Sequence, residues 1–257
     1  MSAGPLSGGF KPEYFEELAP LEERNSWFRT RNRLMGWAIA TYFPEACSFF
    51  EIGCGTGFVQ SGLARILPEL ELYGSELFGE RLIFVARRVP RANLVQMDAR
   101  RIALADSVDV IGAFDVLEHI RENDLVLREM FNAVRPGGGV VITVPQHQFL
   151  WSKQDEYAYH VRRYAAAELR RKLRAAGFSV ARMTSFVSLV LPAMYLSRRK
   201  KQRAAAFDPL DELKIGRVTN AVLEGLLRAE LALIGRGVSF PAGGSLLAVA
   251  YRQRSVK

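Results

Sequence analysis

Short apolar runs alternate with amphipathic stretches of helical length over most of this chain, and this alternation restricts its fold more than any other feature. The runs typical of strands are Cys47–Ile52, Leu70–Gly74, Asn93–Gln96, Ser107–Phe114, Val140–Val144, Phe178–Thr184 and Ser245–Tyr251. The stretches typical of helices are Phe58–Leu67, Glu80–Arg88, Asp124–Val134 and Ala165–Ala176. Parallel strands need crossover connections of this length. The sequence therefore predicts an α/β protein with a mostly parallel sheet and helices on both of its faces.

Four segments are expected from the distribution of these patterns. Residues 1–45 form a helical lead-in with a helix over Glu13–Tyr42, and residues 46–184 form the main α/β domain. Residues 185–240 form a helical insertion, with a helix over Asp208–Ile234, and residues 241–257 supply the final strand. We find no internal repeat of solenoid length.

The apolar content does not indicate a membrane-spanning protein. The longest apolar stretch, Phe186–Leu196, is too short for a bilayer and contains Pro192. The N-terminus has no basic segment followed by an apolar core, and two cysteines do not make a disulfide framework. We therefore expect a cytoplasmic protein, and the pattern of cysteines predicts no metal site.

A glycine-rich loop, GCGTG at 53–57, joins the first predicted strand to the first predicted helix. Glycines there allow a sharp turn and a close approach to a ligand, although a tight turn alone is the simpler interpretation. Glu76 ends the second strand 19 residues after the last glycine, and Asp98 follows the third strand. These carboxylates suit the hydroxyls of a ribose and the amine of an adenine, whereas helix capping is the alternative. The G-x-G-x-G spacing departs from the G-x-G-x-x-G of dinucleotide sites, and no phosphate-loop motif is present.

With these motifs, the sequence resembles the class I S-adenosylmethionine-dependent methyltransferases. The matching segments are EIGCGTG at 51–57, QMDA at 96–99, FDVLEHI at 114–120 and RPGGGVVITVP at 135–145. The resemblance implies a Rossmann-like, seven-stranded sheet whose last strand is antiparallel, and S-adenosylmethionine as the cofactor. It also implies that residues 46–184 bind this cofactor. The residues so implicated are Glu51, Gly53, Gly55, Gly57, Glu76, Leu77, Met97, Asp98, Ala99, Phe114, Asp115 and His119.

The flanking sequences resemble one bacterial subgroup of these enzymes, similar to the methyltransferase-11 and methyltransferase-23 families. The matching flanks are NSWFRTRNRL at 25–34, LWSKQD with HVRRY between 150 and 164, and FPAGGSLLAVAYR at 240–252. This resemblance implies the cofactor and the reaction, but it does not identify the substrate.

Three histidines are the candidate catalytic bases, because a hydroxyl acceptor would have to lose a proton. His119 lies in the FDVLEHI motif, where lining the cofactor or capping a helix is the alternative role. His147 follows the fifth predicted strand, where α/β sites open. His160 lies in the segment Trp151–Tyr164, which is either a substrate wall or a polar surface loop.

The net charge of +8 is divided unevenly along the chain. Residues 1–157 carry 16 basic against 21 acidic residues, a net charge of −5, whereas residues 158–257 carry 19 against 6, a net charge of +13. The basic part is a solvated surface, a dimer contact, or a contact for membrane or anionic substrate. The apolar stretch followed by RRKKQR is the order expected for a peripheral membrane contact through residues 186–203, and apolar contacts inside a dimer or under a cap explain it equally well. Nucleic acid is an unlikely partner, since the basic run has no stacking aromatic residues.

The prediction from sequence is thus a methyltransferase, monomeric or homodimeric, that modifies a small-molecule acceptor or one linked to a lipid or saccharide. The nucleophile is an oxygen, nitrogen or carbon atom. The alternatives are an RNA or protein methyltransferase, or a non-catalytic binding module with the same fold.

Overall fold

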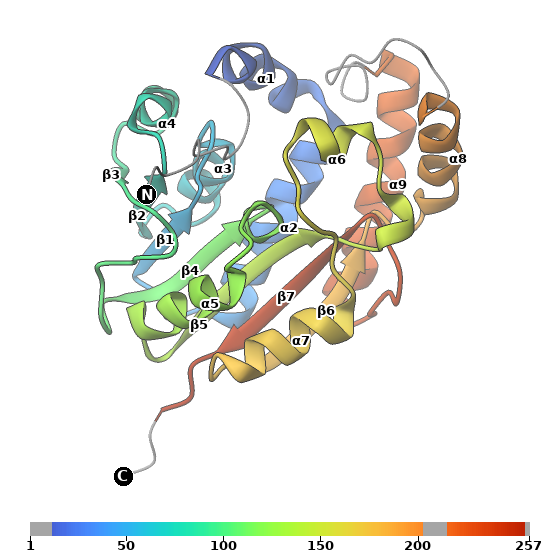
Figure 1. Cartoon of the computed structure of the whole chain (residues 1–257). Coiled ribbons are helices and arrows are strands. Elements are labelled where there is room, and N and C mark those ends of the chain that lie inside the picture. The colour runs from blue at the N-terminus through green and yellow to red at the C-terminus, as the bar shows by residue number, and fades with distance from the viewer. Residues whose placement is uncertain (1–11, 203–214, 255–257) are drawn as a thin grey trace, which may run out of the picture.

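A computed structural model describes residues 12–202 and 215–254 of the chain. Residues 1–11 of the predicted lead-in, part of the predicted insertion helix and Arg203 of the basic run lie outside the described residues. The strands are β1 (Ser48–Ile52), β2 (Glu71–Glu76), β3 (Asn93–Gln96), β4 (Val108–Phe114), β5 (Val134–Pro145), β6 (Ser179–Phe186) and β7 (Ser245–Tyr251). They form one seven-stranded sheet in the order β3-β2-β1-β4-β5-β7-β6 (Figure 1).

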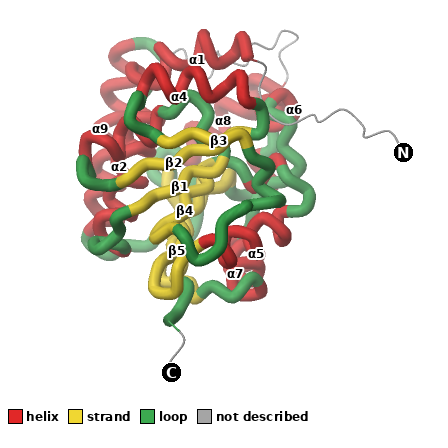
Figure 2. The backbone as a smooth tube through the Cα atoms, turned by 90° about the vertical axis from the view of Figure 1, so that its left-hand side faces the viewer, coloured by secondary structure: helices red, strands yellow, loops and turns green. Residues whose placement is uncertain are grey.

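Helices cover both faces of this sheet, as Figure 2 shows from its edge. The helices in the described residues are α1 (Pro12–Arg24), α2 (Ser26–Tyr42), α3 (Phe58–Ile66), α4 (Leu82–Arg88), α5 (Asn123–Ala133), α6 (Lys153–Tyr157), α7 (Ala166–Ala175), α8 (Leu191–Gln202) and α9 (Arg217–Gly235). Short 3₁₀ turns occur at Gly79–Arg81, Leu117–His119 and Gln148–Leu150. β7 is antiparallel to β5 and to β6, while the other pairs are parallel. The predicted fold class is therefore confirmed.

Two buried clusters hold the helices against the sheet, one on each face. One cluster joins α5 and α7 to the sheet through residues such as Leu127, Met130 and Leu173. The other joins α2, α3 and α9 to the opposite face through Met35, Leu63 and similar residues. The near-continuous burial of β1, β4 and β7 follows from this double coverage and explains why most of their residues are apolar.

The predicted N-terminal helix over Glu13–Tyr42 is wrong in its continuity. It is divided into α1 and α2 at Asn25, whose backbone is extended with φ −80° and ψ 128°. The Asn25 side chain accepts a hydrogen bond from the backbone N–H of Trp27 at 2.9 Å, which caps α2. Asparagine favours this cap position because its short side chain satisfies an N–H group that the helix leaves free.

The insertion between β6 and β7 contains α8 and α9, whereas the sequence predicted a helix over Asp208–Ile234. Pro192 is the second residue of α8, where a missing N–H group is tolerated. α9 packs against α2 and begins at Arg217 after Gly216. Within the described ranges 12–202 and 215–254, no helix has the combined length and hydrophobicity that crossing a membrane requires.

Candidate active site

The loop after β1 has the backbone that only glycine adopts readily. Gly53, Gly55 and Gly57 have φ values of 63°, 56° and 75°, in the left-handed region where a side chain is strained. A Cβ on Gly53 would come within 2.8 Å of Val116, and one on Gly57 within 2.9 Å of Val85. The sequence at 53–57 therefore dictates a tight turn that brings the backbone close to the carboxyl ends of the strands.

A cavity of about 1490 Å³ opens beside this loop. It lies past the carboxyl ends of the parallel strands, with parts of α1, α2, α6, α8 and α9 around it (Figure 1). The predicted cofactor residues that line it are Glu51, Gly53, Gly55, Glu76, Leu77, Met97, Asp98, Ala99, Phe114, Asp115 and His119. Gly57 does not line the cavity, because it packs under α4 at the start of α3.

Glu76 is buried at the end of β2 and is turned toward the glycine loop. Its Oε1 accepts a hydrogen bond from the backbone N–H of Gly55 at 2.7 Å, and Arg81 lies 3.9 Å from its Oε2. Burial raises the pKa of the Glu76 carboxyl, while the Gly55 N–H and Arg81 oppose this shift. The side chain thus presents an acceptor to the cavity next to the loop.

Glu51 is a buried carboxylate in the middle of the sheet, with only 2% of its surface exposed. Its Oε2 has no hydrogen-bond partner in the described part of the chain. Burial raises the pKa of Glu51 well above its usual range, and Arg31 is the main group that opposes the shift. The Oε2 atom of Glu51 therefore has no cationic partner within hydrogen-bonding distance among the described residues.

Asp98 follows β3 and is held by Arg100. The Arg100 guanidinium donates to both carboxylate oxygens, at 3.0 Å to Oδ1 and at 2.6 Å to Oδ2. The hydrogen bond from Arg100 lowers the pKa of Asp98. Both residues line the cavity, so the described conformation pairs Asp98 with a side chain of the chain itself.

Residues of the N-terminal helices complete this side of the cavity, and we did not predict them as site residues. Arg31 of α2 forms an ion pair with Asp115 at 2.6 Å and lies over the ring of Trp27. Glu22 of α1 accepts hydrogen bonds from Thr56 of the glycine loop and from Arg88 of α4. The available signal in the sequence was Arg31 itself, a charged residue at helical spacing between Phe28 and Met35, so that it shares their buried face.

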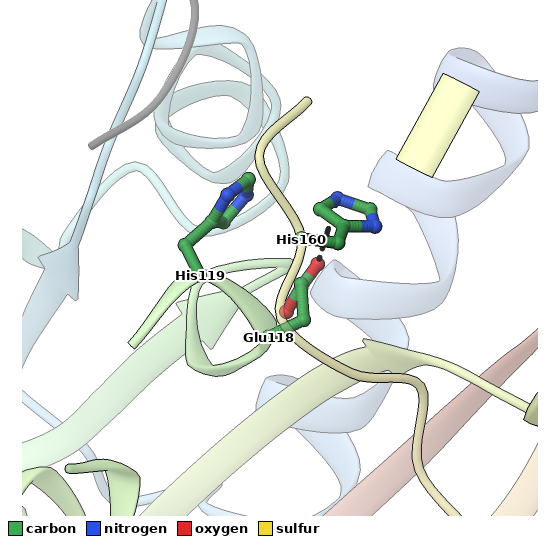
Figure 3. Close-up of side chains that lie close together, drawn as sticks. All are labelled: Glu118, His119 and His160. Carbon is green, nitrogen blue, oxygen red and sulfur yellow. Dashed lines mark ion pairs between the residues drawn. The ribbon is translucent and has the colours of Figure 1, made fainter. Parts of the chain in front are cut away.

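The opposite wall carries two of the three histidines. His119 and His160 line the cavity, with their ring centroids 4.7 Å apart, and Glu118 lies beside them (Figure 3). Burial, together with the neighbouring His160, lowers the pKa of His119 to about 4. His160 lies in the segment between α6 and α7, 41 residues after His119 in the sequence. The fold brings the two side chains together.

An acidic residue and an arginine orient His160. The His160 Nδ1 lies 2.8 Å from Oδ1 of Asp155, and Arg163 donates to both oxygens of the same carboxylate. Although burial raises the pKa of Asp155, hydrogen bonds from His160 and Arg163 hold it at about 2. The ionised carboxylate therefore directs Nε2 of His160 away from itself.

His147 is separate from this arrangement. It does not line the cavity, and its ring stacks on Phe149 with the centroids 4.9 Å apart. Its φ of 63° lies in the left-handed region, which is unusual for a residue with a side chain. His147 was predicted as a candidate base at the mouth of the cleft. It does not line the cavity, and its role as a base stays a prediction.

Comparison with known proteins identifies the family of this chain. The family model described as a methyltransferase domain matches residues 50–142. A protein of Mycolicibacterium smegmatis named probable S-adenosylmethionine-dependent methyltransferase is 30% identical over 183 residues, which cover 70% of this chain and 67% of that protein. The chain belongs to the class I S-adenosylmethionine-dependent methyltransferases.

Other similar proteins match smaller parts or only the fold of this methyltransferase. The trans-aconitate 2-methyltransferase of Azoarcus sp. is 28% identical over 103 residues, which cover 40% of this chain and 41% of that enzyme. Among solved structures, a putative methyltransferase of Haloferax volcanii in complex with a methyltransferase activator superposes with a TM-score of 0.63. It is 15% identical, and the alignment covers 95% of this chain and 96% of that one, so it shows the fold alone.

The cavity of this methyltransferase has the chemistry that S-adenosylmethionine requires. The unpartnered Oε2 of Glu51 suits the positively charged end of the cofactor, and Glu76 suits hydroxyl donors beside the glycine loop. S-adenosylmethionine supplies a methyl group on a positively charged sulfur, which is an excellent leaving group. The chain's own residues have to position the two reactants and exclude water from them.

Proposed function

We propose that this methyltransferase transfers the methyl group to a small-molecule acceptor, or to the small head of a lipid- or saccharide-linked one. The size of the cavity is the observation that carries the proposal. At about 1490 Å³ it exceeds the roughly 300–1,000 Å³ of an ordinary small-ligand site. It therefore has room for the cofactor and for a second molecule of similar size.

The second half of the cavity supports an acceptor with both a polar and an apolar part. Met194 of α8 and Leu223 and Leu227 of α9 line one wall, whereas His160 and Tyr159 line another. An apolar wall with a few polar groups is typical of sites that enclose a small organic molecule. The similar enzyme named for trans-aconitate is a further argument for a small-molecule acceptor.

The transfer itself is a single displacement with a simple balance of atoms. A bond forms between the acceptor atom and the methyl carbon while the carbon–sulfur bond breaks, and its electron pair remains on sulfur. The product is S-adenosylhomocysteine, which has no charge on sulfur. An acceptor hydroxyl also loses its proton, and His119 and His160 are the histidines that line the cavity.

We also propose a peripheral membrane contact through residues 186–203, which would bring a lipid-linked acceptor to the cavity. On this segment Leu189 is 42% exposed and Leu196 is 61% exposed. Both lie directly before or within the helix that carries the basic run. An exposed apolar patch beside basic residues is the pattern expected for docking on anionic lipid.

Titration calorimetry with S-adenosylhomocysteine tests the cofactor site. We expect Glu76→Ala to weaken binding by about 1–3 kcal/mol, as the loss of a charged hydrogen-bond acceptor does. Glu71→Ala is the matched control, because Glu71 is an exposed glutamate at the other end of β2 and does not line the cavity. Equal affinities of the two variants would contradict the role of Glu76.

Methyl transfer from labelled S-adenosylmethionine then tests the acceptor class. We incubate the full chain with fractionated bacterial extract and follow the label into small molecules, lipids, RNA and protein. The proposal predicts label in the small-molecule or lipid fraction. Label in RNA or protein would favour the alternative classes, and binding without any transfer would identify a binding module.

A further inference from the structure

Glu118, His119 and His160 converge at one point of the cavity wall. One ligand atom of each side chain lies within 4.8 Å of the corresponding atoms of the other two. Figure 3 shows the Glu118 carboxylate below the His160 ring, with His119 extending from the same turn as Glu118. His160 Nε2 and Glu118 Oε1 are 3.9 Å apart. Two imidazoles and a carboxylate thus face a common space.

The Glu118 carboxylate has no hydrogen-bond donor among the described residues, although the charges of Arg31 and Arg163 attract it. None of its surface is exposed, and neither carboxylate oxygen accepts a hydrogen bond from a residue within 12–202 or 215–254. The Nδ1 atom of His119 is buried and unpartnered in the same part of the chain. Burying such groups without hydrogen-bond partners is unfavourable, and a cation bound between them would remove this cost.

His160 is hydrogen-bonded in the way that metal-binding histidines usually are. Asp155 accepts from Nδ1 of His160, and Arg163 holds the Asp155 carboxylate from the other side. Histidines that bind metals usually donate their second ring N–H to a carboxylate in this way. The arrangement fixes the ring and leaves Nε2 free to bind a cation on the side of Glu118.

The spacing of the three groups is close to what a metal ion needs. Three atoms within 4.8 Å of one another lie at most about 2.8 Å from a common centre. Zinc-to-nitrogen distances are about 2.0–2.1 Å, so each side chain would move by less than about 1 Å to bind the ion. Side-chain rotation alone can supply such a movement.

We propose that Glu118, His119 and His160 bind a divalent first-row transition-metal ion, with open coordination positions that face the acceptor half of the cavity. The donor set of two imidazoles and one carboxylate suits ions such as Zn²⁺. The sequence predicted no metal site, because the ligands come from two distant segments without a recognisable spacing. The proposal also changes the predicted role of His119 and His160 from bases to ligands.

This inference rests on the proposed function, and it narrows the acceptor to an oxygen nucleophile. A divalent cation beside an acceptor hydroxyl lowers the pKa of that hydroxyl. The hydroxyl then releases its proton to solvent, and its oxygen forms the bond to the methyl carbon as the carbon–sulfur bond breaks. The reaction therefore needs no reactant besides the acceptor and S-adenosylmethionine.

Titration calorimetry of the metal-free full chain with ZnCl₂ tests the site directly. We expect one equivalent to bind to the wild type and to His147→Ala, a control histidine outside the cavity. We expect about 10- to 100-fold weaker binding in Asp155→Asn, because outer-shell residues usually have effects of that size. Glu118→Gln, which loses a ligand and keeps the shape, should lose more affinity than Asp155→Asn.

Two results would overturn the proposal: no saturable binding of Zn²⁺ to the wild type, or equal binding by Glu118→Gln and the wild type. If Glu118→Gln does not fold, a comparison of His160→Gln with His147→Ala makes the same decision. S-adenosylhomocysteine is titrated into each sample separately. Normal binding of that ligand without zinc binding contradicts the metal site alone, whereas no binding of that ligand contradicts the proposed function.

Discussion

Single residues in this methyltransferase combine burial with charge at the positions that face the cavity. Glu51, Glu76 and Glu118 are all less than one-tenth exposed, and burial is the main influence on the pKa of each. An apolar side chain at such a position would pack without this penalty. Charged residues at these buried positions lower the folding stability, and their presence indicates that they bind a ligand.

Replacing Glu51 by glutamine should raise stability at neutral pH. The folded-state pKa of Glu51 is raised, so the unfolded chain releases this proton at a lower pH than the folded chain. The unfolding free energy of the wild type therefore falls, relative to the variant, as pH rises from the ordinary glutamate value through the folded one. Arg31 keeps its ion pair with Asp115 in the variant. We expect a gain on the order of 1–2 kcal/mol above this window.

Chemical denaturation of the wild type and Glu51→Gln at pH 4 and pH 8 measures this difference. The control is Glu71→Gln, which changes an exposed glutamate on the same sheet and should show no gain. A gain for Glu51→Gln of the same size at both pH values would contradict the explanation from ionisation.

At the scale of elements, close packing between helices explains glycines that helix propensity disfavours. Gly62 of α3 and Gly225 of α9 both lie inside helices. A Cβ on Gly62 would overlap the side chain of Asn32 from α2, whereas no atom of the described residues lies within 4 Å of the Cβ position of Gly225. The same residue type therefore has a packing role in α3 and none in α9.

Alanine substitutions at these two glycines should have opposite effects. Gly62→Ala displaces the buried Asn32, whose Nδ2 donates to the carbonyl oxygen of Phe58 at 2.6 Å. We expect a loss of about 1–3 kcal/mol in the free energy of unfolding, as overpacking usually causes. Gly225→Ala should add about 0.5–1 kcal/mol, because alanine restricts the unfolded chain and favours the helix.

Urea denaturation of both variants provides the measurement, and each variant serves as the control for the other. A destabilised Gly225→Ala protein, or a Gly62→Ala protein as stable as the wild type, would contradict this account of how α2 and α3 pack.

At the scale of the whole molecule, charge and exposed apolar surface separate the cofactor side from the rest. The first 157 residues are net acidic and contain the glycine loop and its carboxylates, whereas the later residues are net basic. The exposed side chains of Leu189 and Leu196 belong to the basic part. A surface of this kind is attracted to an anionic membrane without requiring a spanning helix.

Flotation with liposomes that contain anionic lipid should carry the wild-type protein with the vesicles, and neutral liposomes should carry less of it. Leu196→Glu should reduce flotation, because it places a negative charge in the apolar patch. Ile83→Glu is the matched control, since Ile83 is 50% exposed on α4 and lies in the acidic part of the chain. Equal flotation of both variants, or no flotation of the wild type, would contradict the membrane contact.

The sequence by itself determined the alternation of strands and helices, the glycine loop and the carboxylates at the strand ends. These features are local, because burial imposes a periodicity within each segment and the φ values of the loop require glycine there. β3 and β7 therefore match the predicted bounds, and the other strands differ at their ends.

Only the tertiary structure decided which distant side chains meet. It brings Arg31 to Asp115 and Glu118 to His160, and it leaves His147 outside the cavity. Such contacts depend on how the helices and loops pack over the sheet. The hydrophobic pattern within a single segment does not predict that packing. Local motifs in the sequence therefore predicted the residues on the cofactor side of the cavity. The acceptor side and its candidate metal site could be identified only from the tertiary structure.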